Sequence, residues 1–252
     1  MPYLKTEVKC GPYIFTYKGF ALRYLKKNAR GPNIKITTEA QKARNQYYSR
    51  RKRIWLIATN FSKGDLWITL TYKKNKRPAD MAGAKKDRTK FIRKIRNHCK
   101  KNNIRFIYMG MTEIGMRGGV HHHFIMKNGI DESKIFQAWK DFGFVKIGAI
   151  GDIETETQLD EFDEYEEQEK HTEDDVIRLA KYFVKGDSDK SEKNYIQSRY
   201  LKQPKIRKRI IKAERWTGIP KPKKGYTIQS VYDGFHDFSG FPYQEYLMIR
   251  RC

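Results

Sequence analysis

The chain has 252 residues, 38% of them hydrophobic and 13% aromatic, which is enough to build a substantial core. No apolar run approaches 18 residues, no secretion leader follows Met1, and the three cysteines are scattered, so we expect a cytoplasmic protein without membrane spans or disulfides. The 53 basic and 29 acidic residues give a net charge of +24, which favours nucleic acid as the partner.

The excess of positive charge is unevenly distributed. Thirteen acidic residues and one lysine lie between residues 152 and 175, which leaves 52 basic and 16 acidic residues elsewhere. We predict that residues 152–169 form an exposed acidic insertion. It is either a solvated loop or a mimic of DNA that competes for a basic surface.

Residues 1–37 mix aromatic and basic side chains and are predicted to be a basic extension. The alternation over residues 13–17 predicts a strand, and rings interleaved with cations also suit contacts with nucleic acid. A capping box beginning at Thr38 predicts a helix over residues 39–53. Two β-rich runs then follow, residues 54–61 and 66–72, and the glycine-containing turn between them predicts a hairpin.

The pattern becomes helical over residues 82–101, where apolar residues recur at helical spacing among lysines and arginines. Residues 104–113 and 120–126 then predict two strands joined by a glycine-rich turn. We therefore expect these two strands to pair as antiparallel neighbours.

Asp131 can cap a short helix over residues 132–141 that directs Ile135, Phe136 and Trp139 inward. A further strand is predicted over residues 144–150. Helices and strands in this order predict an α+β domain, with an antiparallel sheet and helices packed on one face.

Three consecutive histidines occupy the strand predicted over residues 120–126. Because side chains alternate along a strand, His121 and His123 share one face and His122 lies on the other. Two imidazoles on one face suit a divalent metal, and Glu113 on the preceding strand could complete the site. The alternatives are ordinary surface or core histidines, and a Glu113 that simply pairs with Arg117.

A second capping box at residues 172–175 predicts a helix that continues through Lys185 and stops at Gly186. Tyr182 lies off its apolar stripe, with Arg178 one turn before it and Lys185 one turn after it. A tyrosine between two cations is a plausible nucleophile; the alternative is a half-exposed structural tyrosine. Beyond it, residues 187–252 are predicted as a basic region with a cationic helix at 205–212 and an aromatic tail that docks back.

Three segments resemble, in order and spacing, the motifs of HUH endonucleases, specifically the single-tyrosine rolling-circle replication initiators of bacteria and their phages or plasmids. They are WITLTY at 67–72, VHHHFIM at 120–126 and YFVK at 182–185, and the segment 195–204 is a weaker match. The middle residue of the metal motif is usually hydrophobic, whereas here it is His122.

The resemblance implies a ferredoxin-like fold over residues 38–186, whose central antiparallel sheet carries the histidines and packs against the tyrosine helix. It also implies a sequence-specific single-strand DNA nickase and strand transferase that starts rolling-circle replication in a bacterial cell. Tyr182 would be the nucleophile, assisted by Lys185, and His121, His123 and Glu113 would hold Mn²⁺ or Mg²⁺. Further expected DNA contacts are Thr69, Thr71, Tyr72, Arg117, Arg178, Lys181 and Arg199.

The expected partners are single-stranded DNA or an origin hairpin, together with a host helicase and polymerase, because the chain has no phosphate-binding loop of its own. The same chemistry would serve a relaxase or a single-strand transposase. A non-catalytic DNA-binding protein and a nuclease in which water attacks the phosphate are alternatives from other classes.

Overall fold

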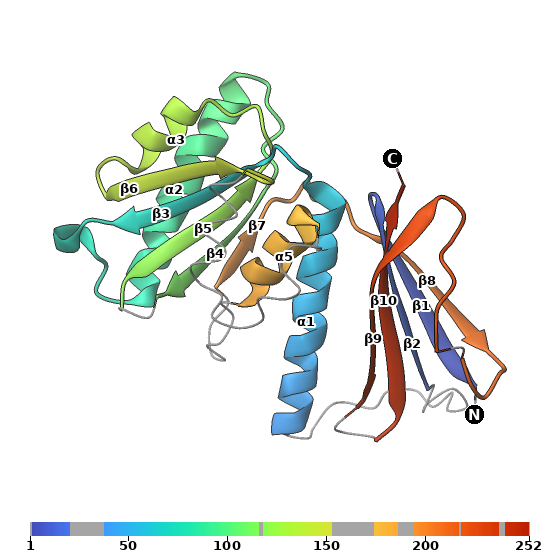
Figure 1. Ribbon diagram of the computed structural model, residues 1–252. Helices are drawn as coiled ribbons and strands as arrows, with labels where there is room; N and C mark the ends of the chain where they lie inside the picture. Colours follow the sequence, from blue (N-terminus) through green and yellow to red (C-terminus); the bar gives the residue numbers. More distant parts are fainter. Residues whose placement is uncertain are drawn as a thin grey trace. The chain divides into compact units, whose positions relative to one another are not determined.

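The computed structural model describes residues 2–20, 38–115, 118–152, 174–185, 194–216, 218–236 and 240–251. The chain forms two compact units, one comprising Met1–Thr59 with Gln203–Cys252 and the other Asn60–Lys202 (Figure 1). Each unit is built around an antiparallel five-stranded sheet. The fold is therefore α+β, in agreement with the predicted ferredoxin-like class.

The sheet of the second unit has the strand order β6-β3-β5-β4-β7. Its strands are β3 (Leu66–Tyr72), β4 (Tyr108–Ile114), β5 (Val120–Met126), β6 (Gly143–Ala149) and β7 (Tyr195–Gln197). Asn60 and Lys202 exchange hydrogen bonds of 2.7 and 2.9 Å, which join the points where the chain enters and leaves the unit.

Helices α2 (Met81–Lys101) and α3 (Glu132–Trp139) cover one face of this sheet. The core beneath them joins Phe91, Ile92 and Ile95 of α2 to Ile68 and Phe124 of the sheet. The apolar stripe predicted for the helix over residues 82–101 is confirmed in α2.

Asp131 caps α3 as predicted, accepting a hydrogen bond of 2.9 Å from the Ser133 amide. The predicted inward positions Ile135 and Trp139 are fully buried. Phe136 was predicted inward as well, and this is wrong: its side chain is 46% exposed, while Ala138 is buried. Helix α3 is only eight residues long and ends at Trp139. Its buried face consists of Ile135, Ala138 and Trp139, and Phe136 lies outside that face.

Helix α5 (Asp175–Lys185) lies on the opposite face of the sheet, where Phe183 packs against Trp67 and Tyr195 with ring centroids 6.1 and 5.7 Å apart. The prediction of helices on a single face is therefore wrong. Adjacent residues of β5, Phe124 and Ile125, are both fully buried, so the sheet is apolar on both faces and both need a cover.

The first turn of α5 is capped by Asp174, whose carboxylate accepts hydrogen bonds from the amides of Val176 (3.0 Å) and Ile177 (3.4 Å). Thr172, the predicted cap, lies outside the described residues, as does the acidic insertion 152–169 apart from Asp152.

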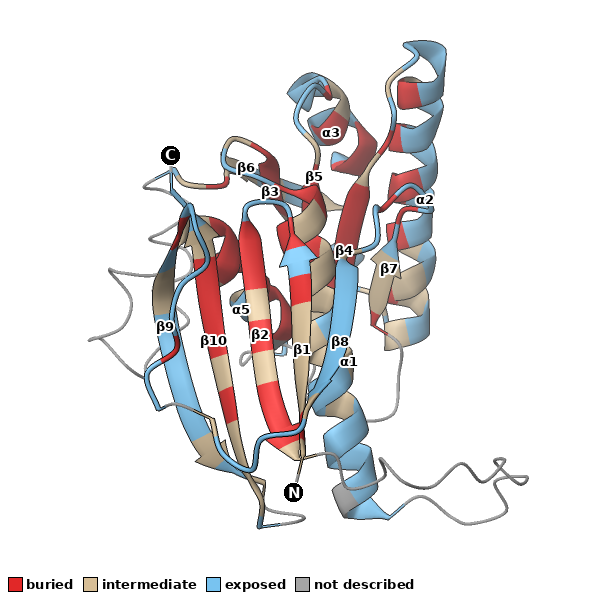
Figure 2. Cartoon of the chain, turned by 90° about the vertical axis from the view of Figure 1, so that its right-hand side faces the viewer, coloured by how far each residue is buried: buried red, intermediate tan, exposed pale blue. Residues whose placement is uncertain are grey.

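The first unit joins both ends of the chain in one sheet of order β8-β1-β2-β10-β9. Its strands are β1 (Tyr3–Cys10), β2 (Tyr13–Phe20), β8 (Lys205–Ile211), β9 (Tyr226–Phe235) and β10 (Pro242–Arg250). Figure 2 shows buried residues along the inner strands β2 and β10 and a largely exposed edge strand β8. These boundaries differ from the predicted separate extensions 1–37 and 187–252.

The cationic helix predicted at residues 205–212 is wrong, because this segment is the strand β8 and pairs with β1. The aromatic tail does dock back, since β10 pairs with both β2 and β9.

Helix α1 (Glu39–Asn60) begins as predicted but continues to Asn60 and so takes in all but the last residue of the run 54–61. The predicted first strand and its hairpin are therefore wrong. Ile57 and Ala58 are buried in the last turns of α1. Within the first unit, the Arg51 guanidinium lies 5.1 Å from the Tyr17 ring centroid and 3.1 Å from Glu245, which ties α1 to the sheet. None of the helices among the described residues is long and apolar enough to cross a membrane.

Candidate active site

The histidine strand β5 lies between β3 and β4, and its register brings the predicted site residues together. His121 stands opposite Glu113 on β4 and opposite Thr71 on β3, while Thr69 stands opposite His123. Directly paired residues point to the same side of a sheet. The predicted placement of His121, His123 and Glu113 on one face is therefore confirmed.

His123 is held on three sides. Its Nε2 lies 2.7 Å from the Glu113 carboxylate, its Nδ1 lies 3.1 Å from the Thr69 hydroxyl, and its ring stacks on Trp67 at 5.2 Å. His121 is held by a hydrogen bond between Nδ1 and the Thr71 hydroxyl at 3.3 Å and by stacking on the His123 ring at 6.3 Å. The two threonines thus fix both imidazole rings through the same nitrogen, Nδ1.

The charges of these groups favour ligation. Burial raises the pKa of Glu113, but the hydrogen bond from His123 and the nearby charges of His123 and His121 outweigh it, so the pKa lies below its usual value. Burial lowers the pKa of His121, as do the charges of His123 and Arg77. An ionised carboxylate and a neutral imidazole are the protonation states that a divalent metal requires.

The donor set fits a divalent ion in its chemistry, since imidazole and carboxylate groups are both ligands of divalent metals. Ring nitrogens oriented by a second hydrogen bond are typical of metal-binding histidines. Across the described part of the chain, however, no three His, Cys, Asp or Glu side chains already surround a common point. Glu113 instead pairs directly with His123, and that hydrogen bond would have to be replaced by ligation.

Tyr182 lies beside the histidines although it is far from them in sequence. Its ring centroid is 6.3 Å from that of His123 and 5.8 Å from that of Trp67. The planes of the Tyr182 and His123 rings are nearly perpendicular, at 89°. The packing of α5 through Phe183 on Trp67 fixes this position. Tyr182 and the two histidines therefore lie on the same face of the sheet.

The other predicted site residues are distributed unevenly. Arg178 and Lys181 lie on α5, and Lys185 is its last residue. Arg199 is exposed in the turn after β7, and Arg117 lies outside the described residues.

Tyr72 is buried on the opposite side of the sheet, where its hydroxyl lies 2.9 Å from His122 Nε2. The structure therefore does not bring Tyr72 to the histidine pair.

The structure shows that His122, whose role the sequence did not indicate, is a buried residue of the core. It is fully buried, with Nδ1 2.8 Å from the Thr112 hydroxyl, and Arg88 donates to that same hydroxyl at 2.8 Å and to the Asn194 carbonyl at 2.6 Å. Burial and the charge of Arg88 lower the pKa of His122 to about 3, so it is neutral. Arg88 had no distinguishing signal in the sequence, because it is one of many cations on its helix.

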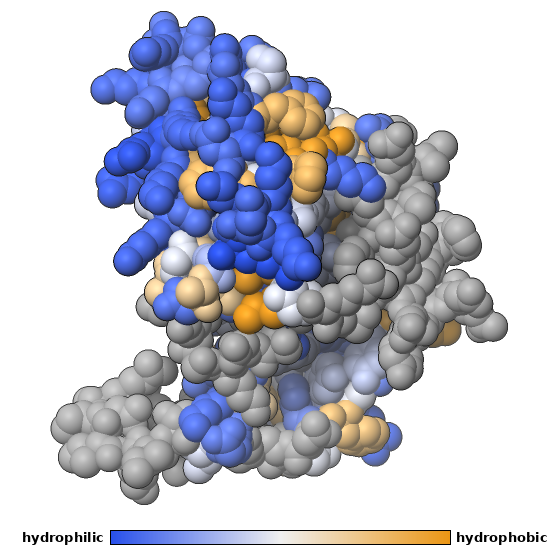
Figure 3. All heavy atoms as spheres, turned by 90° about the vertical axis from the view of Figure 1, so that its left-hand side faces the viewer, coloured by the Kyte–Doolittle hydropathy of each residue, from blue (hydrophilic) through white to orange (hydrophobic). Residues whose placement is uncertain are grey.

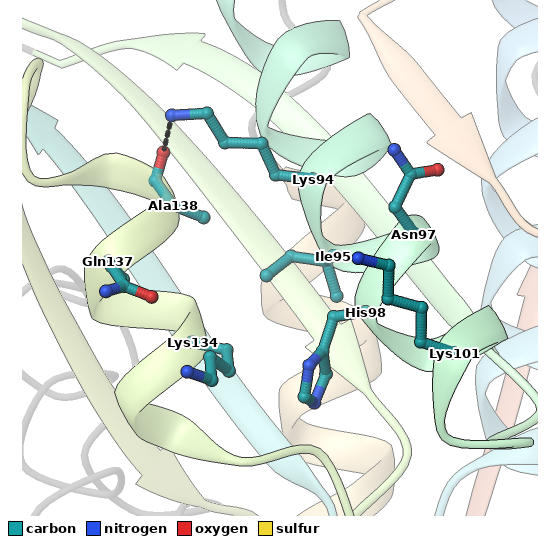
Figure 4. A pocket seen from close by; sticks show the side chains of 8 residues that line it. All are labelled: Lys94, Ile95, Asn97, His98, Lys101, Lys134, Gln137 and Ala138. Atoms are coloured by element: carbon teal, nitrogen blue, oxygen red, sulfur yellow. Dashed lines mark hydrogen bonds between the residues drawn. The ribbon is translucent and has the colours of Figure 1, made fainter.

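Basic side chains also gather away from this site. A hollow between α2 and α3 is lined by Lys94, Lys101, Lys134 and His98, and no carboxylate lies among its lining residues (Figure 4). Figure 3 shows a largely hydrophilic surface with smaller hydrophobic patches on the face that it presents. These features fit a polyanionic partner but add no group to the chemistry of the histidine site.

The model of one protein family, described as replication-associated protein ORF2/G2P, matches residues 65–187, just under half of the chain. The matched stretch contains His121, His123, Glu113 and Tyr182. Neither the comparison with curated proteins nor that with solved structures found a match. Over this stretch the chain is therefore similar to a replication-associated family.

Proposed function

We propose that this protein is a metal-dependent, sequence-specific nickase and strand transferase that cuts single-stranded DNA to initiate rolling-circle replication. The observation that carries the proposal is the position of Tyr182, whose ring lies 6.3 Å from that of His123 on the sheet face that also holds His121 and Glu113. The match of this same stretch to a replication-associated family supports it.

In the proposed reaction, the Tyr182 oxygen attacks a backbone phosphorus as the bond from phosphorus to the 3′ oxygen breaks. The departing oxygen takes a proton and becomes a free 3′-OH, which can prime synthesis, while the 5′ phosphate stays on the tyrosine. The reverse attack by a 3′-OH rejoins the strand without ATP, because the phosphotyrosine retains the bond energy. A host helicase and polymerase would then extend the strand.

The chain's own residues have three roles in this scheme. A free tyrosine has a pKa near 10, so about one in a thousand is ionised at pH 7. Cations at positions 178 and 185, one turn before and after Tyr182, would favour the phenolate. His121, His123 and Glu113 would hold a divalent ion, which when bound would offset the charge of the non-bridging phosphate oxygens.

The test is to incubate the protein with fluorescent single-stranded origin DNA and Mn²⁺. We expect a denaturant-resistant protein–DNA adduct that disappears with chelator and in Tyr182→Phe. Tyr200→Phe is the matched control, because Tyr200 is exposed in the same unit and lies outside the site. An adduct that persists in Tyr182→Phe would refute the assignment of the nucleophile.

The competing functions predict other products. Free 5′-phosphate ends with no trapped protein would select a hydrolytic nuclease, and binding without cleavage at any metal concentration would select a non-catalytic DNA-binding protein. A relaxase or a single-strand transposase would form the same adduct, and the DNA sequence that supports it would distinguish them from an initiator.

A further inference from the structure

An exposed phenylalanine lies on the face of the sheet that carries His121 and His123. It is one strand beyond the threonines that contact these histidines. Phe144 belongs to β6, the edge strand, and stands directly opposite Thr71, whose hydroxyl contacts His121. Paired residues share a face, so Phe144 points to the side of the histidine pair. Two strand spacings of about 4.8 Å place its backbone about 10 Å from that of His121.

Phe144 is 64% exposed, which makes it a poor contributor to the core. A single exposed apolar side chain is common and by itself indicates nothing. Its surroundings distinguish it, because a lysine shares its face of the same edge strand and the charge of an arginine acts on the nearby His121.

Lys146 lies two residues further along β6 and opposite Thr69, so it shares the face of Phe144 and is also exposed. Arg77 follows the C-terminal end of β3, the end at which Thr71 lies, and is close enough to His121 for its charge to act on the imidazole. The intervening 3₁₀ turn, Lys74–Lys76, adds two exposed lysines. An aromatic ring among cations is the arrangement with which proteins bind single strands, by stacking on bases and pairing with phosphates.

We propose that Phe144 is a stacking platform for a base next to the cleaved phosphate, and that Lys146 holds the adjoining backbone. This role rests on the proposed function, since it assumes that single-stranded DNA crosses this face. It would set which phosphate reaches Tyr182, because a stacked base fixes the register of the strand. The edge position suits it, since no further strand covers Phe144 on its outer side within the described sheet.

The test uses the full chain with Tyr182→Phe, so that binding is measured without cleavage. The probes are a fluorescein-labelled oligothymidylate of about 20 nucleotides and an abasic oligomer of equal length and charge. Phe144→Ala should weaken binding of the oligothymidylate by about 5- to 150-fold, the range for one lost base stack, and leave the abasic oligomer unaffected. Phe144→Trp should retain the preference for bases.

Two further variants separate stacking from general effects. Phe136→Ala removes a phenylalanine of similar exposure from α3, on the other side of the sheet, and should change neither affinity. Lys146→Gln should reduce the salt dependence of both oligomers, by about 0.7 in the slope of log K against log salt.

Oligothymidylate binding that does not depend on Phe144, or equal weakening of both oligomers, would overturn the inference alone. A protein that binds neither these oligomers nor single-stranded origin DNA would overturn the proposed function as well.

Discussion

Acidification should destabilise the metal-free protein through His122, the middle residue of the histidine strand. Its pKa is about 3 in the folded protein against an ordinary value of 6.5, chiefly because it is buried. The unfolded chain therefore binds more protons between these two values, so stability is full above pH 6.5 and falls as the pH drops toward 3. At about 1.4 kcal/mol per pH unit, a change from pH 7 to pH 5 costs about 2 kcal/mol.

The assay is urea unfolding of wild type and His122→Gln in the presence of chelator, at pH 7 and pH 5. The variant keeps a polar side chain near Thr112 and Tyr72 but does not titrate. The fluorescence of buried Trp139, whose ring lies 5.4 Å from that of His122, reports unfolding of this core.

Wild type should lose about 2 kcal/mol more than the variant over this pH range, or about 1 M in the urea midpoint at a slope of about 2 kcal/mol per M. Equal losses would show that His122 is protonated without cost, and the reasoning about its burial would be refuted.

Three further predictions test the surroundings of the site. Phe183→Ala should lower the free energy of unfolding by about 3–5 kcal/mol, because it empties the contact between α5 and Trp67; a loss below about 1 kcal/mol in urea unfolding would contradict this packing. Thr69→Val should weaken Mn²⁺ binding by about 10- to 100-fold in a calorimetric titration, since His123 loses the partner of Nδ1; unchanged affinity would remove the orienting role. Asp174→Ala should cost about 1 kcal/mol in urea unfolding, whereas Asp174→Asn should keep the cap; equal losses in both variants would argue against the hydrogen bonds to α5.

Short-range patterns predicted the elements that surround the site. Alternation along residues 120–126 separates His122 from its neighbours, and the short glycine-rich turn before it brings Glu113 opposite His121. The apolar stripe of α2 and the Asp131 cap of α3 follow from the same local rules. These features are set by residues within about one turn or one hairpin of each other. At this range, regular helix and strand geometry makes the position of a side chain predictable from its spacing in the sequence.

Long-range pairing decided the elements that were predicted wrongly. Residues 54–58 form a short apolar run, which fits a buried strand and a buried helix equally well, and packing makes it part of the last turns of α1. Residues 205–211 have Ile206 and Ile210 at helical spacing, yet they pair with β1, about 200 residues earlier. Local propensity does not encode a partner so distant in the chain.

The sequence by itself determined a basic α+β protein with two imidazoles and a carboxylate on one sheet face, because these follow from composition and alternation. The placement of Tyr182 beside His123 was implied only by the resemblance to a family, and the packing of α5 on Trp67 produces it. Only the tertiary structure disclosed the network of His122, Thr112 and Arg88 and the exposed Phe144 beside the site. Burial and exposure at these positions depend on which elements cover each face of the sheet, and that is decided when the whole unit folds.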